Sequence, residues 1–230
     1  MKDSPVLIAL DGPVSSGKSS LADAVAIQLG ILHLDTGAMY RAVGLAALRL
    51  GIDPADEQSV KSMIEAGQAD VDVRFIQGQQ QTLLNGKPID HEIRSQEAGS
   101  AASNVSRYKD VRRYLVSRQQ QISQHQSMIV DGRDIGTVVL PQAKVKIFIQ
   151  ASPEVRAKRR YLQLKEQGSD ASYESVLSEL NQRDRQDTQR LNDPLRQAVD
   201  ALLLDTSKLN FKESVDAIVA IANEAYGKAR

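Results

Sequence analysis

The sequence predicts an α/β fold, a doubly wound parallel sheet of about five strands with a small β-rich insert. Short, continuous apolar runs alternate along the chain with longer amphipathic stretches. Strands whose two faces are both covered by helices show this pattern, and right-handed crossovers join them into one parallel sheet. One segment breaks the alternation, because it contains strand-like runs and the turn signal Asn85-Gly86, which is typical of a β-hairpin.

The continuous apolar runs predict the strands of the parallel sheet, at Val6–Leu10, Ile31–Leu34, Met128–Val130, Val145–Ile149 and Ala201–Leu204. The amphipathic stretches predict the helices, at Leu21–Leu29, Ala38–Leu50, Val111–Ile122, Pro153–Leu164, Ser172–Arg190 and Val215–Tyr226. Strand-like runs at Val71–Phe75 and Gln81–Leu84 place the insert at 67–103. The core domain then comprises residues 1–66 and 104–230.

Composition excludes several classes of function. Lysine and arginine together number 29, as do aspartate and glutamate, and this zero balance does not favour a nucleic-acid-binding surface. The chain has no cysteine, which excludes thiolate catalysis, disulfides and cysteine metal sites. No apolar run approaches the roughly 20 residues that span a bilayer. A strand follows Met1–Pro5 directly, so we expect no signal peptide and a cytoplasmic protein. We expect a monomer by default, since no large apolar stripe argues for assembly.

Residues 12–19 match the phosphate-loop pattern G-x-x-x-x-G-K-[ST] at every fixed position, with a predicted strand before them and a predicted helix after them. Glycines allow a tight turn in which successive backbone N–H groups face one anion. We therefore expect Lys18 to reach the β and γ phosphates of a nucleotide and the Ser19 hydroxyl to bind Mg²⁺. The predicted nucleotide-binding residues are Gly12, Pro13, Val14, Ser15, Ser16, Gly17, Lys18, Ser19 and Ser20.

A second apolar run ends in the acidic turn Asp131-Gly132-Arg133-Asp134. A strand that ends in aspartate resembles the Walker B strand, whose carboxylate holds the magnesium shell, and ligands of open α/β sheets bind at strand ends. We predict that Asp131 joins Ser19 at the metal. The spacing leaves open whether Asp131 or Asp134 lies nearer the ion.

Arginines are concentrated on two predicted helices. Arg156, Arg159 and Arg160 share one face of the first, since they are spaced at i, i+3 and i+4. On the second, the charged residues Arg183, Asp187 and Arg190 extend an apolar stripe. Charges that continue a buried face indicate a wet cleft, because dry, unpaired burial would cost several kcal/mol.

The three histidines, His33, His91 and His125, are scattered and show no metal-ligand spacing. A kinase that acts on an alcohol usually needs a base to accept the hydroxyl proton. A phosphate acceptor does not, because its second pKa lies near 6 and its oxygen is already anionic at neutral pH. Abundant arginine without an obvious base therefore favours a phosphate as the acceptor.

The sequence resembles bacterial-type cytidylate kinases from its first strand to its last helix. The residues that bear the resemblance are the phosphate loop, Leu34–Arg41, Glu92–Glu97, Ala101–Ser103, Asp131–Asp134 and the Arg183, Asp187, Arg190 series. It implies transfer of the γ-phosphoryl group of ATP, bound with Mg²⁺, to CMP or dCMP. The segment 67–103 then corresponds to the monophosphate-binding insert, and a mobile lid covers about 156–171.

The resemblance also assigns roles to residues. Thr36 (a position where the family often has serine), Arg41, Arg133 and Arg190 would hold the monophosphate. Ser103, Arg112 and Asp134 would contact the cytosine edge, and Arg183 and Asp187 the ribose. The catalytic residues would be Lys18, Arg133, Arg156, Arg160, Arg183 and Arg190, with Arg156 and Arg160 in the lid. The segment Asp205–Lys208 resembles the loop beside adenine.

Two rival functions remain at this stage. Another P-loop kinase would phosphorylate a different small molecule, such as dTMP, dephospho-coenzyme A or shikimate. A regulatory P-loop NTPase would instead use nucleotide hydrolysis as a switch. It predicts slow hydrolysis without an acceptor and no stimulation by CMP, and nothing in the sequence resembles the base-recognition motif of a GTP switch.

Overall fold

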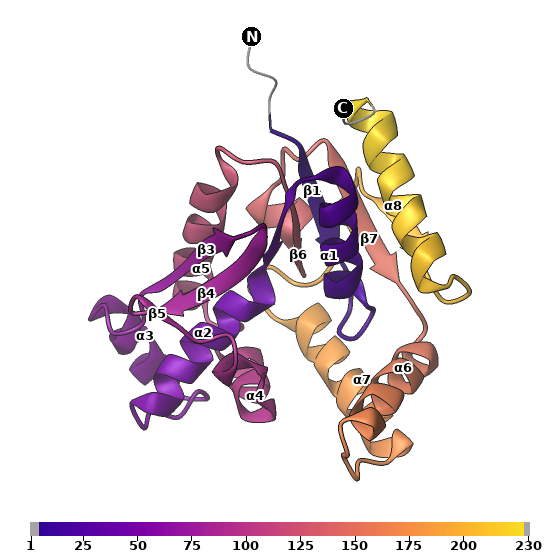
Figure 1. Ribbon diagram of the computed structural model, residues 1–230. Coiled ribbons are helices and arrows are strands. Elements are labelled where there is room, and N and C mark those ends of the chain that lie inside the picture. The colour runs from indigo at the N-terminus through magenta and orange to yellow at the C-terminus, as the bar shows by residue number, and fades with distance from the viewer. Residues whose placement is uncertain (1–4, 228–230) are drawn as a thin grey trace. The chain divides into compact units, whose positions relative to one another are not determined.

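A computed structural model describes residues 5–227 of the chain (Figure 1). Its strands are β1 Leu7–Asp11, β2 Leu32–Asp35, β3 Val71–Ile76, β4 Gln79–Leu84, β5 Lys87–Pro88, β6 Met128–Gly132, β7 Val145–Gln150 and β8 Leu202–Asp205. Its α-helices are α1 Lys18–Leu29, α2 Thr36–Arg49, α3 Glu57–Glu65, α4 Gln96–Val105, α5 Lys109–Ser123, α6 Pro153–Glu166, α7 Tyr173–Gln189 and α8 Phe211–Tyr226. There are also a 3₁₀ turn, η1 Glu92–Arg94, and a π-helical turn, η2 Ile135–Val139.

The strands form two sheets, a five-stranded sheet in the order β2-β6-β1-β7-β8 and a three-stranded sheet in the order β3-β4-β5. This confirms the predicted α/β class with a β-rich insert. The chain divides into two compact units. Unit 1 comprises 31–128 and the segment up to Val6, and unit 2 comprises 7–30 and 129–230. The predicted division into a core and a monophosphate-binding insert at 67–103 follows different boundaries and stays a prediction.

Unit 2 contains the strand that leads into the phosphate loop. β1 pairs in parallel with β7, from Ile8 opposite Val145 to Asp11 opposite Phe148. Because parallel strands end at the same edge of a sheet, Asp11 lies at the edge where ligands of such sheets bind. Helices α1 and α8 pack against each other (Figure 1). The core between helices and strands is apolar and fully buried, with Leu10, Val25 and Ile218 at 0% exposure.

β8 differs from its prediction in one respect. Its continuous apolar run was expected to be covered on both faces, yet Leu202 and Leu203 are 54% and 52% exposed. β8 is the last strand in the sheet order and pairs with β7. An edge strand has a neighbouring strand on one side only. An apolar run in the sequence does not show whether a strand lies at the edge or how well its faces are covered.

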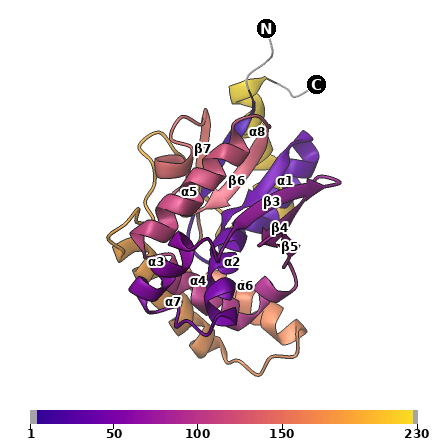
Figure 2. The same cartoon turned by 90° about the vertical axis from the view of Figure 1, so that its left-hand side faces the viewer.

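Two tight turns shape the small sheet of unit 1 (Figure 2). Gln77 and Gly78 join β3 to β4, and Asn85 and Gly86 join β4 to β5, all four with positive φ. Two-residue hairpins of type I′ need positive φ at both central positions, which Asn-Gly supplies at little cost. The hairpin predicted at Asn85-Gly86 is therefore confirmed.

Helices α3 and α4 were not predicted. α3 begins at an N-cap, Asp56, whose carboxylate accepts hydrogen bonds from the backbone N–H groups of Gln58 and Ser59. α4 buries Ala98, Ala101, Ala102 and Val105, and most of it falls in the segment that the strand-like runs assigned to the β-rich insert. It packs closely on α2, because a Cβ at Gly44 would lie 2.8 Å from the Ala101 Cβ.

The hairpin formed by α6 and α7 coincides with the predicted lid and the helix after it (Figure 1). Serines cap both helices, since Ser152 and Ser172 accept hydrogen bonds from the first turns. Ala157, Val176 and Leu180 form a small buried core between the helices. Within residues 5–227, no helix combines the length and apolarity needed to cross a membrane.

Candidate active site

The phosphate loop of unit 2 takes a conformation that depends on glycine. A Cβ at Gly12 would lie 2.5 Å from the Ile149 carbonyl oxygen, so this position admits only glycine without a shift of backbone. Ser15 has φ 57 and Gly17 has φ 86, and the left-handed Gly17 is the N-cap of α1. Left-handed residues that alternate with right-handed ones turn successive backbone N–H groups into one concave surface. The Ser16 Oγ is buried and has no hydrogen-bond partner among the described residues, which fits a loop built for an anion.

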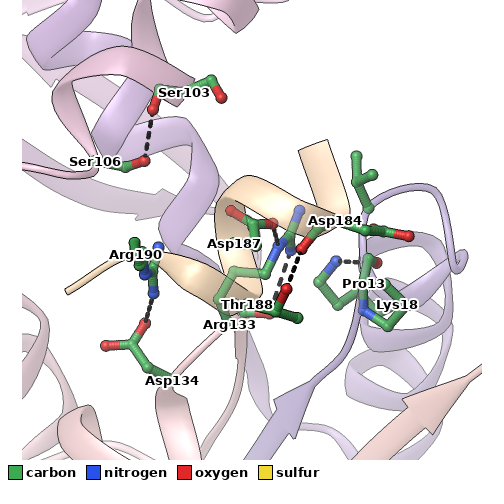
Figure 3. A network of polar contacts seen from close by, with 12 residues as sticks. Pro13, Lys18, Ser103, Ser106, Arg133, Asp134, Asp184, Asp187, Thr188 and Arg190 are labelled. Carbon is green, nitrogen blue, oxygen red and sulfur yellow. Dashed lines mark hydrogen bonds and ion pairs between the residues drawn. The ribbon is translucent and has the colours of Figure 1, made fainter. Parts of the chain in front are cut away.

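Lys18 and Ser19 begin helix α1. The Lys18 side chain is 6% exposed, and its Nζ donates to the Pro13 carbonyl at 3.2 Å, so it bends back over the loop (Figure 3). The Ser19 Oγ donates to the Asp131 Oδ2 at 2.8 Å. Asp131 is buried near the end of β6. Two hard oxygen ligands therefore lie together here, the donor set that suits Mg²⁺.

Asp11, which sequence reasoning missed, joins the strand end before the loop to the turn after β6. Its two carboxylate oxygens accept hydrogen bonds from the backbone N–H groups of Ile135, at 2.7 Å, and Gly136, at 2.8 Å. Burial raises the pKa of Asp11 to about 6, an effect that the two backbone donors partly offset. The charge of Asp134 raises the pKa further and that of Lys18 lowers it. Its place at a strand end, directly before Gly12, was the available sequence signal.

Arg133 pairs with Asp187 of α7, and its Nε lies 2.7 Å from the carboxylate (Figure 3). Burial lowers the pKa of the Arg133 guanidinium, but the charge of Asp187 and its hydrogen bond more than compensate, so the pKa is raised overall. Asp131 and Asp184 add to the rise. The guanidinium is therefore held in its charged form, as a phosphate-binding role requires.

Arg190, the C-cap of α7, lies 3.4 Å from Asp134, and both side chains are almost fully buried (Figure 3). Its Nε also donates to the Asp193 carbonyl, at 2.8 Å. Arg183 is 26% exposed and lies 3.4 Å from Glu179, one turn earlier. The charged continuation of the α7 stripe is thus partly buried and paired within unit 2, and the turn at Asp131–Asp134 supplies two of its partners.

The arginines of α6 have separate partners. Arg156 is 3% exposed, and its guanidinium donates to the carbonyls of Ala151, at 2.9 Å, and Val14, at 3.0 Å, and to Asp184, at 2.6 Å. Arg159 donates to the Thr206 carbonyl at 2.8 Å. Arg160 donates to Gln163 on its own helix at 2.9 Å. Asp184 was not foreseen as a partner, because the charge pattern singled out Arg183, Asp187 and Arg190 on this helix and not Asp184.

In unit 1, Thr36 opens helix α2 and is 3% exposed, while Arg41 donates to the Ile93 carbonyl at 3.0 Å. The preceding peptide of Asp35 is held by the side-chain amide of Gln80 on β4. The Gln80 Oε1 accepts from the Asp35 N–H at 2.7 Å, and its Nε2 donates to the Asp35 carbonyl at 3.2 Å. Sequence reasoning did not find Gln80, since no motif singles out one glutamine in a polar strand.

Ser103 and Arg112 converge on the end of α4. The Ser106 Oγ donates to the Ser103 carbonyl at 3.0 Å, and the Arg112 guanidinium donates to the Ser106 carbonyl at 3.2 Å. Arg112 is 2% exposed, and its guanidinium lies 5.5 Å from the centre of the Tyr40 ring. Two predicted base-reading residues thus lie together with Tyr40, a residue of the same motif as Thr36 and Arg41.

This fold and this loop define a P-loop phosphotransferase of the small kinase type. The family model described as cytidylate kinase matches residues 8–224. The chain belongs to the cytidylate kinase family.

Curated relatives agree with this assignment, and a solved structure shares the fold. A cytidylate kinase from Caldicellulosiruptor bescii is 42% identical over 93% of this chain and 94% of its own length. One from Thermosipho melanesiensis is 45% identical over 96% of this chain and 98% of its own. A gluconokinase structure from Sinorhizobium meliloti covers 96% of this chain and 94% of that chain at a TM-score of 0.50 and 15% identity. At that identity the likeness concerns the fold alone.

Proposed function

We propose that this protein is an ATP:CMP phosphotransferase, which transfers the γ-phosphoryl group of ATP to CMP or dCMP and releases ADP with CDP or dCDP. The observation that supports it best is the set of charges in unit 2. A phosphate loop with a buried lysine lies on the same unit as Arg133 and Arg190, each paired to a carboxylate. Cations held in place beside a phosphate loop suit a reaction that proceeds by charge neutralisation.

Unit 2 would hold ATP. The backbone N–H groups of the loop would bind the phosphates, and Lys18 would exchange its contact with the Pro13 carbonyl for the β and γ phosphates. Mg²⁺ would be held by Ser19 and Asp131, since their oxygens already lie 2.8 Å apart. Asp134 pairs with Arg190 instead, which favours Asp131 of the two aspartates. The ion, when bound, would neutralise charge on the phosphates.

The residues proposed for the phosphate of the acceptor are Thr36, Arg41, Arg133 and Arg190. Ser103, Arg112 and Asp134 are proposed for the cytosine, and Arg183 and Asp187 for the ribose. A guanidinium binds phosphate through parallel N–H donors, which makes arginine suited to the first set.

The acceptor needs no protein base. All three histidines belong to unit 1, so the phosphate-loop unit contains none. A phosphate oxygen that is anionic at neutral pH can attack the γ-phosphorus directly. The arginines would then stabilise the charge that spreads over the transferred group, with Arg156 and Arg160 proposed for this role from the α6–α7 hairpin. Exclusion of water by that hairpin would limit hydrolysis of ATP.

A coupled assay of ADP release tests the proposal, with ATP·Mg²⁺ and either CMP, dCMP, UMP, AMP, dTMP or shikimate in parallel. Selective turnover with CMP and dCMP is the expected result. Turnover with another acceptor would retain the phosphate-loop chemistry but overturn the assignment of Ser103, Arg112 and Asp134. Hydrolysis without stimulation by any acceptor would favour a nucleotide switch and contradict the proposal.

A further inference from the structure

The carboxylate of Asp11 is shared by two backbone groups that come from a distant part of the sequence. Its Oδ1 accepts from the Ile135 N–H and its Oδ2 from the Gly136 N–H, across 124 and 125 positions of the chain. The side chain is 4% exposed. Within unit 2, one buried carboxylate therefore ties the end of β1 to the start of the η2 turn.

Both of the segments joined in this way belong to the site. Asp11 is followed directly by Gly12 of the phosphate loop. Ile135 follows directly after Arg133 and Asp134, which are paired with Asp187 and Arg190. A shift at Ile135 would therefore move the two residues proposed for the acceptor's phosphate and base.

The space around residue 136 is narrow, so a side chain there would require small shifts of its neighbours. A Cβ added to Gly136 would lie 3.2 Å from the Lys146 Cδ and 3.4 Å from the Asp11 Oδ2. The turn then widens into a π-helical form, in which the Leu140 N–H donates to the Ile135 carbonyl at 2.7 Å. The first N–H groups of a helical turn have no partner within the turn. Here the first two, those of Ile135 and Gly136, donate to Asp11.

We propose that Asp11 is a positioning residue for phosphoryl transfer, whose carboxylate fixes the turn bearing Arg133 and Asp134 against the strand that leads into the phosphate loop. The inference rests on the proposed function and deepens it. Asp11 itself need not touch either substrate. A carboxylate is suited to the task because each oxygen can accept one N–H, whereas an amide would turn its NH₂ group toward one of them.

The Asp11 carboxylate is buried, where its charged form is less favourable than in water. Burial raises the pKa of Asp11 to about 6, which means that the charged form is disfavoured relative to water. A buried acid kept where an apolar residue would cost less is typical of a functional site. This supports the geometric argument, which stands on the two hydrogen bonds and the close approach of Gly136.

Asp11→Asn tests the inference, with Asp56→Asn as the matched control. Asp56 also accepts two backbone N–H groups, but it caps α3, which contains none of the proposed site residues. Loss of a charged hydrogen bond corresponds to about tenfold to 150-fold, and we expect kcat/KM for CMP to fall by that factor in Asp11→Asn. KM for ATP should stay near the wild-type value, because the phosphate loop keeps its own hydrogen bonds, such as those from Leu21 to Gly17 and from Arg156 to Val14.

Hydrogen exchange gives a readout that does not depend on activity. The Ile135 and Gly136 amides should be protected in the wild type and in Asp56→Asn. At least one of the two should lose protection in Asp11→Asn, because the Asn side chain keeps a single accepting oxygen. Gly136→Ala provides a second variant if Asp11→Asn fails to fold. It retains the carboxylate and crowds it, so we expect the same change in CMP kinetics with a smaller amplitude.

The outcomes separate the inference from the function on which it rests. Unchanged exchange at both amides would overturn the inference that the Asp11 carboxylate holds the Ile135 and Gly136 N–H groups in solution. Altered exchange with unchanged CMP kinetics would overturn the positioning role, as would a loss of kcat that only follows the unfolded fraction. If the wild type fails to phosphorylate CMP while Asp11→Asn still alters exchange at the Ile135 and Gly136 amides, the proposed function and the role of Asp11 in transfer are overturned. The two hydrogen bonds to Asp11 are then still supported.

Discussion

Arg156 and Asp184 form an ion pair in which the guanidinium nitrogen lies 2.6 Å from the carboxylate, and their side chains are 3% and 21% exposed. The same guanidinium donates to the Val14 carbonyl of the phosphate loop, at 3.0 Å. A single side chain of α6 thus joins α7 to the loop within unit 2. The pair gives the arginine a defined place in the fold.

Asp184→Ala should lower the free energy of unfolding by about 2–4 kcal/mol, because removal of one member leaves a buried charge uncompensated. Urea denaturation measures this change in the free energy of unfolding. The exposed pair Lys212–Asp216, at 2.5 Å, offers a control. Asp216→Ala should cost no more than about 1 kcal/mol, since solvent screens an exposed pair. Equal losses in the two variants would contradict the structural role of the Arg156–Asp184 pair.

Lys18→Ala should reduce kcat by roughly 10²- to 10³-fold, as expected when one preorganised charge donor is lost from a transition state. The melting temperature should change little, because the lysine is proposed to serve the phosphates. Lys158→Ala is the control, since Lys158 lies exposed on α6. Steady-state ADP release measures both variants, and wild-type turnover in Lys18→Ala would remove the lysine from the mechanism.

UMP should be a poorer acceptor than CMP by about tenfold to 150-fold in kcat/KM, because it presents an acceptor where cytosine presents its N4 donor. Asp134→Asn should narrow that ratio, since an amide can donate to the uracil oxygen as well as accept from cytosine. The ratio is the relevant quantity, because loss of the Asp134–Arg190 pair would affect both acceptors. An unchanged ratio would contradict the assignment of Asp134 to the base.

The pKa of Asp11, raised from 3.8 to about 6, has a consequence for stability. A carboxyl whose pKa is higher in the folded state favours folding below its unfolded pKa, and this contribution is lost as the pH rises through the folded value. Between pH 4 and 7, the wild type should therefore lose about 2 kcal/mol relative to Asp11→Asn, which cannot titrate.

Urea titrations of both proteins across that pH range measure the difference. The pKa of Asp56 is lowered, chiefly by its hydrogen bond from Ser59. The stability that Asp56 contributes should therefore be lost as the pH falls, which is opposite to the change expected for Asp11. A constant difference between wild type and Asp11→Asn would show that Asp11 does not titrate differently in the folded state.

Most of the fold could be predicted from the sequence because its signals are local. The five runs of the parallel sheet are continuous and apolar, and all five form strands within two residues of the predicted bounds. The Asn85-Gly86 turn was predictable for the same reason, since the two residues themselves tolerate positive φ. Helix α4 was not predicted, because most of it falls in the segment 67–103, which the strand-like runs and the Asn85-Gly86 turn marked as β-rich.

The site was predictable where a motif repeats a known chemistry, as in the phosphate loop. The pairing of its charges was not. Arg133 meets Asp187 across 54 positions, and Asp11 meets Gly136 across 125. Nothing local in a sequence relates such positions, because strand order and helix packing decide which side chains meet. The roles assigned to individual site residues stay predictions until the variants above are measured.

Unit 2 is built from two separate stretches of chain, whereas 31–128 is continuous. In the five-stranded sheet β1 lies between β6, Met128–Gly132, and β7, Val145–Gln150. During synthesis, β1 and the phosphate loop therefore leave the ribosome before either of the strands that flank β1. β1 cannot form its hydrogen bonds in the sheet until those later strands have been made.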